Sequence, residues 1–122
     1  MRGMLAACAA VVLSLALAAA ATGRSGGSTL KGTVGPGFTI TLQQNGKKVT
    51  SLKAGKYKFV IADKASIHNF VVEQESGGKF EKELTHVSFT GTKTVSVTLK
   101  KGKWKYYCKP HESSMFGFFR VT

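Results

Sequence analysis

The sequence has few acidic residues, few prolines and few cysteines. Six Asp and Glu stand against 18 Lys and Arg, which gives a formal charge of +12 over 122 residues. With only two prolines and two cysteines, a collagen-like chain and a disulfide-dense scaffold are excluded. The hydrophobic share of 43% is that of an ordinary soluble chain, and the length fits one domain. The excess of positive charge favours an acidic protein, an anionic membrane surface or a nucleic acid as partner.

Long apolar runs are also missing, except at the N-terminus. There, residues 5–21 are apolar apart from Ser14, follow a short basic start and end on Ala19-Ala20-Ala21, a small-residue cleavage site. This pattern is typical of a secretory signal peptide, which we place at residues 1–21. If it stays uncleaved, the run approaches the about 20 residues of a bilayer span and would associate the protein with a membrane. We therefore expect export to the periplasm or the extracellular space, which argues against nucleic acid as partner.

No stretch keeps a helical period for long. Residues 22–29 are small and polar, as in a flexible leader. Residues 30–122 alternate with a period of two in short runs between turn residues, and Asn45-Gly46 predicts a tight hairpin turn. Phe38 and Ile40 are expected on one inward face with Leu42. Seven or eight short strands at this spacing predict an all-β sandwich, with a helical turn or a long crossover in the less regular residues 79–88.

Cys108 is the only thiol left once the signal peptide, with Cys8, is removed. Exported thiols tend to pair or oxidise, so a lone one needs an explanation. Formation of a dimer, burial as an inert thiol and metal ligation are the three candidates. The residues that follow Cys108 decide between them.

Cys108, His111 and Met115 form a C-x2-H-x3-M pattern on a tight loop between two expected strands. Thiolate, imidazole and thioether are soft or borderline ligands, and His68, on an earlier strand, offers a second imidazole. Two His, one Cys and a weak axial Met form the trigonal set that suits copper cycling between Cu(I) and Cu(II). Taken singly, these residues would be an ordinary core thiol, a core histidine and a gap filler. Their joint occurrence predicts a site for one type 1 copper ion.

At these residues the chain resembles the cupredoxins, the superfamily of plastocyanin, amicyanin and azurin. The likeness covers about residues 30–122 and is strongest at residues 66–70 and 104–117, the second of which is similar to the family's Y-Y-C-x-P-H loop. The resemblance implies a Greek-key β-sandwich. It also implies His68, Cys108 and His111 as equatorial copper ligands and Met115 as the axial ligand.

The resemblance extends to the residues that support the ligands. Asn69 matches the Asn that ties the first ligand strand to the ligand loop, and Pro110 lies within that loop, so both are expected to fix ligand geometry. Two features depart from the family pattern. The spacing between His111 and Met115 is x3, between the x4 of plastocyanins and the x2 of amicyanins, and Lys109 stands where Ser or Thr is usual.

The function implied by the resemblance is one-electron transfer between redox partners rather than catalysis. Multicopper oxidases and nitrite reductases need further histidines, usually as H-x-H pairs, whereas this chain has three histidines and none so paired. A copper carrier or storage protein that uses the same ligands is the alternative. A structural sandwich without metal is a second alternative. His86 lies outside the pattern and is expected to be a solvated loop residue.

Three aromatic residues are candidates for an electron-transfer surface: Tyr107, Phe116 and Phe118. Tyr107 is covalently next to Cys108 and points outward by strand parity, as Phe116 and Phe118 do if Phe119 points inward. The lysines around Tyr107 (Lys103, Lys105 and Lys109) would steer a redox partner with an acidic docking face toward a monomeric protein. The alternative is that the aromatics cover the core and the lysines only aid solubility.

Overall fold

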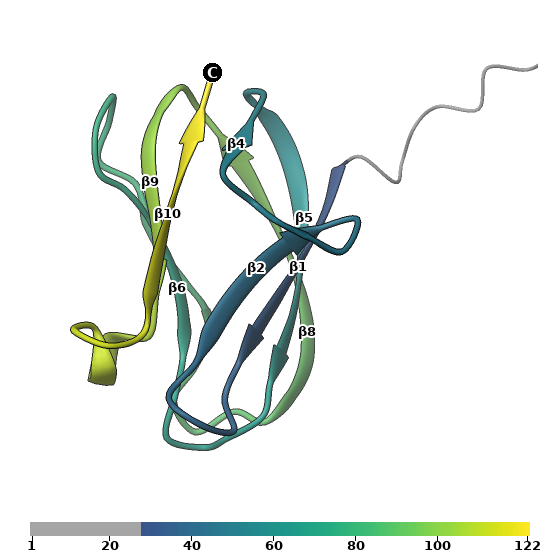
Figure 1. Cartoon of the computed structure of the whole chain (residues 1–122), viewed down its shortest axis with the longest axis vertical. Helices are drawn as coiled ribbons and strands as arrows, with labels where there is room; N and C mark the ends of the chain where they lie inside the picture. Colours follow the sequence, from purple (N-terminus) through teal and green to yellow (C-terminus); the bar gives the residue numbers. More distant parts are fainter. Residues whose placement is uncertain (1–27) are drawn as a thin grey trace, which may run out of the picture.

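The computed structural model describes residues 28–122, which form ten strands in two sheets packed face to face (Figure 1). The predicted signal peptide and most of the predicted leader lie outside the described residues. The strands are β1 (Thr29–Val34), β2 (Ile40–Gln44), β3 (Lys47–Lys48), β4 (Ser51–Leu52), β5 (Gly55–Asp63), β6 (Phe70–Gln74), β7 (Glu81–Thr85), β8 (Gly91–Leu99), β9 (Gly102–Tyr107) and β10 (Phe116–Val121). Within residues 28–122, no helix is long and apolar enough to cross a bilayer.

The two sheets have the strand orders β3-β2-β1-β5-β8 and β4-β10-β9-β6-β7. Since β3 and β4 have only two residues each, the eight longer strands agree with the predicted count, and the all-β sandwich is confirmed. The predicted hairpin turn is confirmed too, because Asn45 and Gly46 both have positive φ, 51° and 77°, between β2 and β3. The expectation of a helical turn or crossover in residues 79–88 is wrong. Strand β7 lies there and pairs with β6, and its exposed, charged first half hides the alternation.

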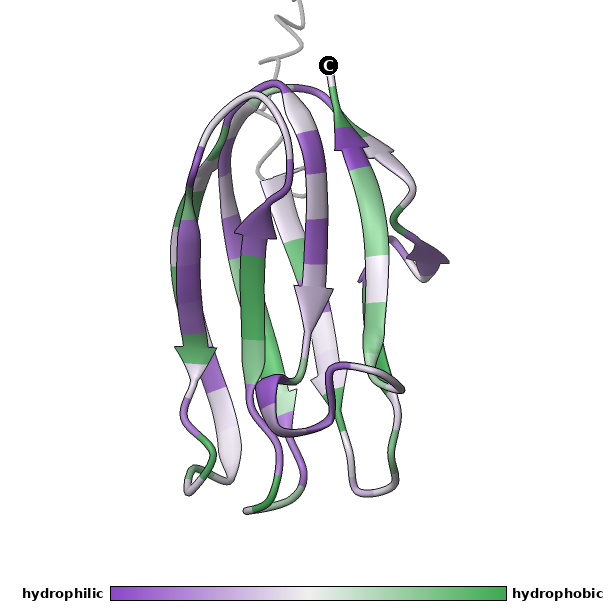
Figure 2. Ribbon diagram, turned by 90° about the vertical axis from the view of Figure 1, so that its left-hand side faces the viewer, coloured by the Kyte–Doolittle hydropathy of each residue, from purple (hydrophilic) through white to green (hydrophobic). Residues whose placement is uncertain are grey.

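Alternation along the strands builds the core between the sheets (Figure 2). In β5 the side chains of Tyr57, Phe59 and Ile61 are buried, while Lys56 and Lys58 are exposed. In β9 the inward-facing positions are Trp104 and Tyr106, both buried, and Cys108 continues the same inward parity just past the strand end. The buried core cluster includes residues from both sheets within 28–122, so this domain closes a core of its own.

Trp104 is the largest fully buried side chain, and its removal is expected to cost the domain much of its stability. The indole stacks on Phe119, contacts Phe80 and donates a hydrogen bond from Nε1 to the Lys100 carbonyl at 2.9 Å. Trp104→Ala should therefore lower the free energy of unfolding by about 3–5 kcal/mol, against a typical total of about 5–15 kcal/mol. Denaturant unfolding of the copper-free protein measures this. Phe118→Ala, at an exposed position, is the control, and an equal loss in both variants would contradict the prediction.

The strand directions give the sandwich two distinct ends. β1 and β5 run in parallel toward one end, where Asp63 pairs with Gly91 at the start of β8. The loops 35–39, 64–69, 86–90 and 109–115 join the strands at this end. The opposite end carries the start of β1, the turns after β4 and β8, and the C-terminus (Figure 1).

Candidate metal centre

His68 lies in the turn before β6 and is fully buried. Its amide donates a long hydrogen bond to the Ala65 carbonyl at 3.4 Å. The imidazole packs against Gly35, which has a φ of 74°, and a Cβ at Gly35 would lie 3.0 Å from Cδ2 of His68. A glycine is therefore favoured at this position both by its backbone conformation and by the room that the ring needs.

The other ligand candidates come from the loop between β9 and β10. Cys108 leads into a short 3-10 helix, Lys109–His111, in which Pro110 fixes one backbone angle. The His111 amide donates to the Cys108 carbonyl at 3.1 Å, and the Met115 amide donates to the His111 carbonyl at 2.9 Å. The Cys108 amide in turn donates to the Met115 carbonyl at 3.0 Å. These bonds fold the loop back on itself and bring its three candidate ligands to one end of the sandwich.

The side-chain atoms converge as the sequence pattern predicts. Sγ of Cys108 lies 3.7 Å from Nδ1 of His68 and 3.6 Å from Nδ1 of His111, and the two Nδ1 atoms are 3.1 Å apart. Ligand atoms that share one ion lie at such separations, because each metal bond to nitrogen or sulfur is about 2.0–2.3 Å long. Met115 is fully buried at the same loop. His68, Cys108 and His111 thus form a preformed group of metal-ligating atoms.

Two buried polar atoms near this group have no hydrogen-bond partner among the described residues: Nε2 of His68 and Oδ2 of Asp63. Burial raises the pKa of Asp63, and bonds from the Thr85 hydroxyl and the Ala65 amide, together with the charge of His68, act against that rise. Nε2 is not the ring nitrogen that faces the other candidate ligands. Nδ1 of His68 is, at 3.1 Å from Nδ1 of His111 and 3.7 Å from Sγ of Cys108, so the case for a metal-binding histidine depends on Nδ1.

Asn69 links the His68 turn to the ligand loop. Its Oδ1 accepts a hydrogen bond from the Lys109 amide at 2.7 Å, and its Nδ2 donates to Oε2 of Glu83 at 2.6 Å. The other oxygen of Glu83 pairs with Nδ1 of His86. The sequence predicted the role of Asn69 in joining the two segments but gave no signal for Glu83, which lies on the exposed half of β7.

Glu83 is expected to stabilise the ligand loop in a pH-dependent way. Burial acts to raise its pKa, but the bonds from Asn69 and His86 and the charge of His86 outweigh it, so the pKa is lowered overall. A lowered pKa means that the stabilisation is complete above the ordinary value for Glu and is lost as the pH falls through the lowered value. Glu83→Gln should cost about 1 kcal/mol at neutral pH, because the carboxylate is partly exposed.

Thermal unfolding of wild type and Glu83→Gln from neutral to acidic pH measures this effect. The gap between the two proteins should close in acid, where Glu83 is protonated. Glu75→Gln, which removes an exposed carboxylate from a loop at the other end, should show no such gap. A gap of constant size at every pH would contradict the assigned role.

Tyr107 points to the outer face of the second sheet but is only 4% exposed, which strand parity did not predict. Its hydroxyl donates a hydrogen bond to Oε1 of Glu81 at 2.6 Å. Burial and this bond together raise the pKa of Tyr107 well above its ordinary value. Nearby, Lys105 pairs with Glu112 at 2.8 Å and Lys109 lies 3.9 Å from Glu81. Two of the three lysines expected to steer an acidic partner are therefore paired with carboxylates.

Phe38 is the residue whose predicted position is wrong. It does not face the core with Leu42 but is 60% exposed, with its ring edge-on to those of His111 and His68, at centroid distances of 4.8 and 5.5 Å. The reason is that β2 begins only at Ile40, so Phe38 belongs to the loop that Gly35-Pro36-Gly37 opens. That turn signal in the sequence could have placed it correctly.

The other aromatic candidates lie on the outer face of β10. Phe116 and Phe118 are 45% and 41% exposed, and lysine ammonium groups lie over their rings. His86 is 70% exposed in its side chain, and its partner is Glu83 rather than any of the converging ligand atoms. The candidate ligands and the candidate electron-transfer residues thus lie around the same end of the sandwich or on the adjoining face.

Together, this fold and this donor set define a small β-sandwich metalloprotein with the ligand arrangement of a type 1 copper site. The family described as "Copper binding proteins, plastocyanin/azurin family" matches residues 33–122. The chain belongs to this family, and its cofactor is copper. No curated protein matches the sequence.

Solved structures of cupredoxins share the fold at low sequence identity. A rusticyanin variant superposes with a TM-score of 0.53 at 16% identity, covering 77% of this chain and 76% of that one. An amicyanin variant in the Cu(I) state gives 0.52 at 11% identity, with 78% and 83% covered. Rusticyanin from Thiobacillus ferrooxidans gives 0.50 at 20% identity, with 77% and 76% covered. At such identities the likeness concerns the fold.

Proposed function

We propose that the protein is an exported type 1 copper protein that carries single electrons between redox partners. The observation that carries this proposal is the convergence of Nδ1 of His68, Nδ1 of His111 and Sγ of Cys108 within 3.1–3.7 Å. These three residues would hold the copper, with Met115 as a weak axial ligand. Bound there, copper supplies a one-electron couple between Cu(I) and Cu(II).

The supporting structure suits fast electron transfer. The ligand loop is held by its own backbone bonds and by Asn69, so the ligands need little movement when the charge of the metal changes. The protein offers four candidate donors, three of which, Met115, His68 and Cys108, are buried. A metal held by protein donors alone has no vacant position for a substrate, so we propose an electron carrier and not an enzyme.

Electrons would enter or leave through His111, the half-exposed member of the ligand group. Phe38 lies beside its ring, and Ile67 and Phe116 are exposed on the neighbouring loop and strand. We propose that a redox protein docks transiently on this apolar surface of a monomeric carrier. The lysines next to Tyr107 are partly paired with carboxylates. We therefore propose that the overall charge of +12, rather than these lysines, attracts an acidic docking face on the partner.

Tyr107 supports a second route to the copper. It follows the covalent path through Cys108, and its hydroxyl reaches Glu81 at the outer face of the sheet. Phe116 pairs with Tyr107 across the strands, and Phe118 lies two residues further along β10. We propose that the exposed Phe116 and Phe118 form a lateral surface for a second partner, with the buried Tyr107 on the path from that surface to Cys108.

A copper carrier or storage protein is the second candidate, because the half-exposed position of His111 also offers an exit for the metal. Two rates on the copper-loaded protein separate the functions: electron self-exchange and copper loss to a chelator. Electron transfer predicts fast exchange and slow loss. Rapid loss of copper with slow electron self-exchange would contradict the electron-transfer function and favour copper transport or storage. Phe38→Ala should slow exchange, whereas Val87→Ala, at an exposed position of a neighbouring loop, should leave it unchanged.

A further inference from the structure

We propose that the end of the sandwich opposite the copper site docks on an anionic lipid membrane. Six exposed basic residues define this surface, here called the basic end: Lys53, Lys56, Lys100, Lys101, Lys103 and Arg120. They come from three separate places in the fold, namely the β4–β5 turn with the start of β5, the β8–β9 turn with the start of β9, and the end of β10. The proposal rests on export, and it does not depend on which copper function is correct.

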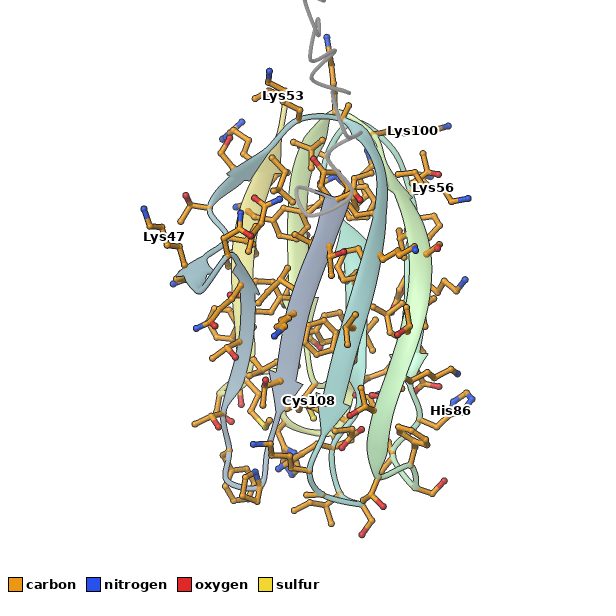
Figure 3. All side chains as sticks on the ribbon, turned by 90° about the vertical axis from the view of Figure 1, so that its right-hand side faces the viewer. Lys47, Lys53, Lys56, His86, Lys100 and Cys108 are labelled. Atoms are coloured by element: carbon orange, nitrogen blue, oxygen red, sulfur yellow. The ribbon has the colours of Figure 1, made fainter. Side chains whose placement is uncertain are left out.

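The strand pairing brings these residues together. Gly55 pairs with Leu99, so the turns that carry Lys53 and Lys100 lie side by side. Lys103 pairs with Arg120 across β9 and β10. Figure 3 shows Lys53, Lys56 and Lys100 at the end of the molecule away from Cys108.

Little negative charge opposes the basic end. Among the described acidic side chains only Glu75 lies there, where its amide donates a hydrogen bond to the Lys103 carbonyl. A cleft of about 280 Å³ beside it is lined by Lys79 and Lys100, which adds one more lysine. Toward the copper end, by contrast, Lys105 pairs with Glu112 and Lys109 lies 3.9 Å from Glu81. The positive charge is thus concentrated away from the metal.

The character of the basic end favours lipid over protein as its partner. Protein interfaces depend on buried aromatic and apolar anchors. The exposed large hydrophobic side chains of the described residues are Phe38, Ile67, Val87, Phe116 and Phe118. Of these only Phe118 borders the basic end, and Nζ of Lys103 lies over its ring at 4.4 Å from the centroid. Clustered lysines with a single such neighbour are closer to the pattern that binds anionic headgroups through charge than to a protein interface with several apolar anchors.

The connectivity of the chain points to the same partner. β1 starts beside the basic end, because Thr29 pairs with Lys58 near the beginning of β5. Residues 22–28 join this strand to the apolar run of residues 5–21. Seven residues span at most about 25 Å when fully extended. In a chain whose apolar run is uncleaved and lies in a membrane, the basic end is therefore the part of the domain that is held near the lipid, and after cleavage the basic residues alone would hold it there.

Docking in this orientation has a functional consequence. The copper end, with His111 and Phe38, would face away from the lipid. A redox partner could then reach the copper while the protein remains on the membrane surface.

Sedimentation with vesicles tests the proposal on residues 22–122, the chain left after the predicted cleavage, which contains the whole described core. The domain should bind vesicles that contain phosphatidylglycerol at low salt and should not bind pure phosphatidylcholine. Each lysine near an anionic surface contributes about fivefold to binding. Lys53→Gln, Lys100→Gln and Lys101→Gln combined should therefore weaken binding about 100-fold.

The matched control changes three lysines elsewhere, Lys64→Gln, Lys82→Gln and Lys93→Gln, and removes the same total charge. It should weaken binding only a few fold. Equal weakening in the two triple variants, or no binding to phosphatidylglycerol, would overturn the proposal. Retention on immobilised polyglutamate is measured for the same variants. If the basic-end variant lost only this retention and bound vesicles as well as wild type, the proposal would be overturned and the basic end assigned to an acidic protein. The visible spectrum of each sample reports separately on the copper site, so failure of docking and failure of the copper function are distinguishable.

Discussion

Cys108→Ser is expected to abolish the intense blue colour of the Cu(II)-loaded protein. The colour of a type 1 site requires a copper–thiolate bond, and a serine hydroxyl is a poor substitute for the thiolate. Sγ of Cys108 is the atom that both Nδ1 atoms approach within 3.7 Å. Visible absorption of the loaded wild type and variant, at equal copper, measures the loss.

Cys8→Ser in the full-length chain is the matched control, because Cys8 is the only other cysteine in the sequence. This variant should keep the full absorption. Colour retained in Cys108→Ser and lost in Cys8→Ser would show that the sulfur ligand is not the one that the fold places beside the histidines.

Replacement of Met115 should keep the copper and change its reduction potential. A thioether is a weak copper ligand, so His68, Cys108 and His111 would be sufficient to hold the ion. In Met115→Leu a donor is lost, so Cu(II) is less stable relative to Cu(I) and the reduction potential rises. In Met115→Gln an amide oxygen is a harder ligand that stabilises Cu(II) more, which lowers it. Each tenfold change in the relative stability of the two states corresponds to about 59 mV.

Voltammetry and copper analysis of the same samples check both parts of this prediction. Ser114→Ala, at the exposed position next to Met115 in the loop, should leave the potential unchanged. Complete loss of copper from both Met115 variants would show that the axial contact is essential for binding rather than weak.

The sequence contained enough information for the sandwich and for the convergence of the site. Period-two alternation in β5 and β9 predicted which faces are buried, because a strand with one face in the core must alternate. Cys108 could be placed inward since it continues the parity of Trp104 and Tyr106. The meeting of His68 with Cys108, 40 residues apart, was predictable only because the ligand types fit one metal.

Three features of the site were not predictable from the sequence. They depend on the residue at which a strand begins and on which neighbouring strand covers a side chain. Phe38 matches the strand pattern, but the strand starts two residues later, so the ring lies by His111 instead of in the core. Tyr107 has outward parity, yet Glu81 of the neighbouring β7 covers it. Glu83 and its bond to Asn69 depend on strand pairing between β6 and β7, which composition does not reveal.

The distribution of charge was likewise hidden. The formal charge of +12 is a property of composition, and the lysines closest in sequence to Cys108 were the natural candidates for a docking surface. The structure pairs Lys105 with Glu112 and gathers unopposed lysines at the other end of the sandwich. Strand register, not sequence proximity, determines which charges face a partner.

A crystal structure of the copper-loaded protein, with anomalous diffraction recorded at the copper absorption edge, tests the central claim most directly. The account predicts one strong anomalous peak, within bonding distance of Nδ1 of His68, Nδ1 of His111 and Sγ of Cys108. A peak elsewhere, for instance between Glu83 and His86, with none among these three atoms, would contradict it.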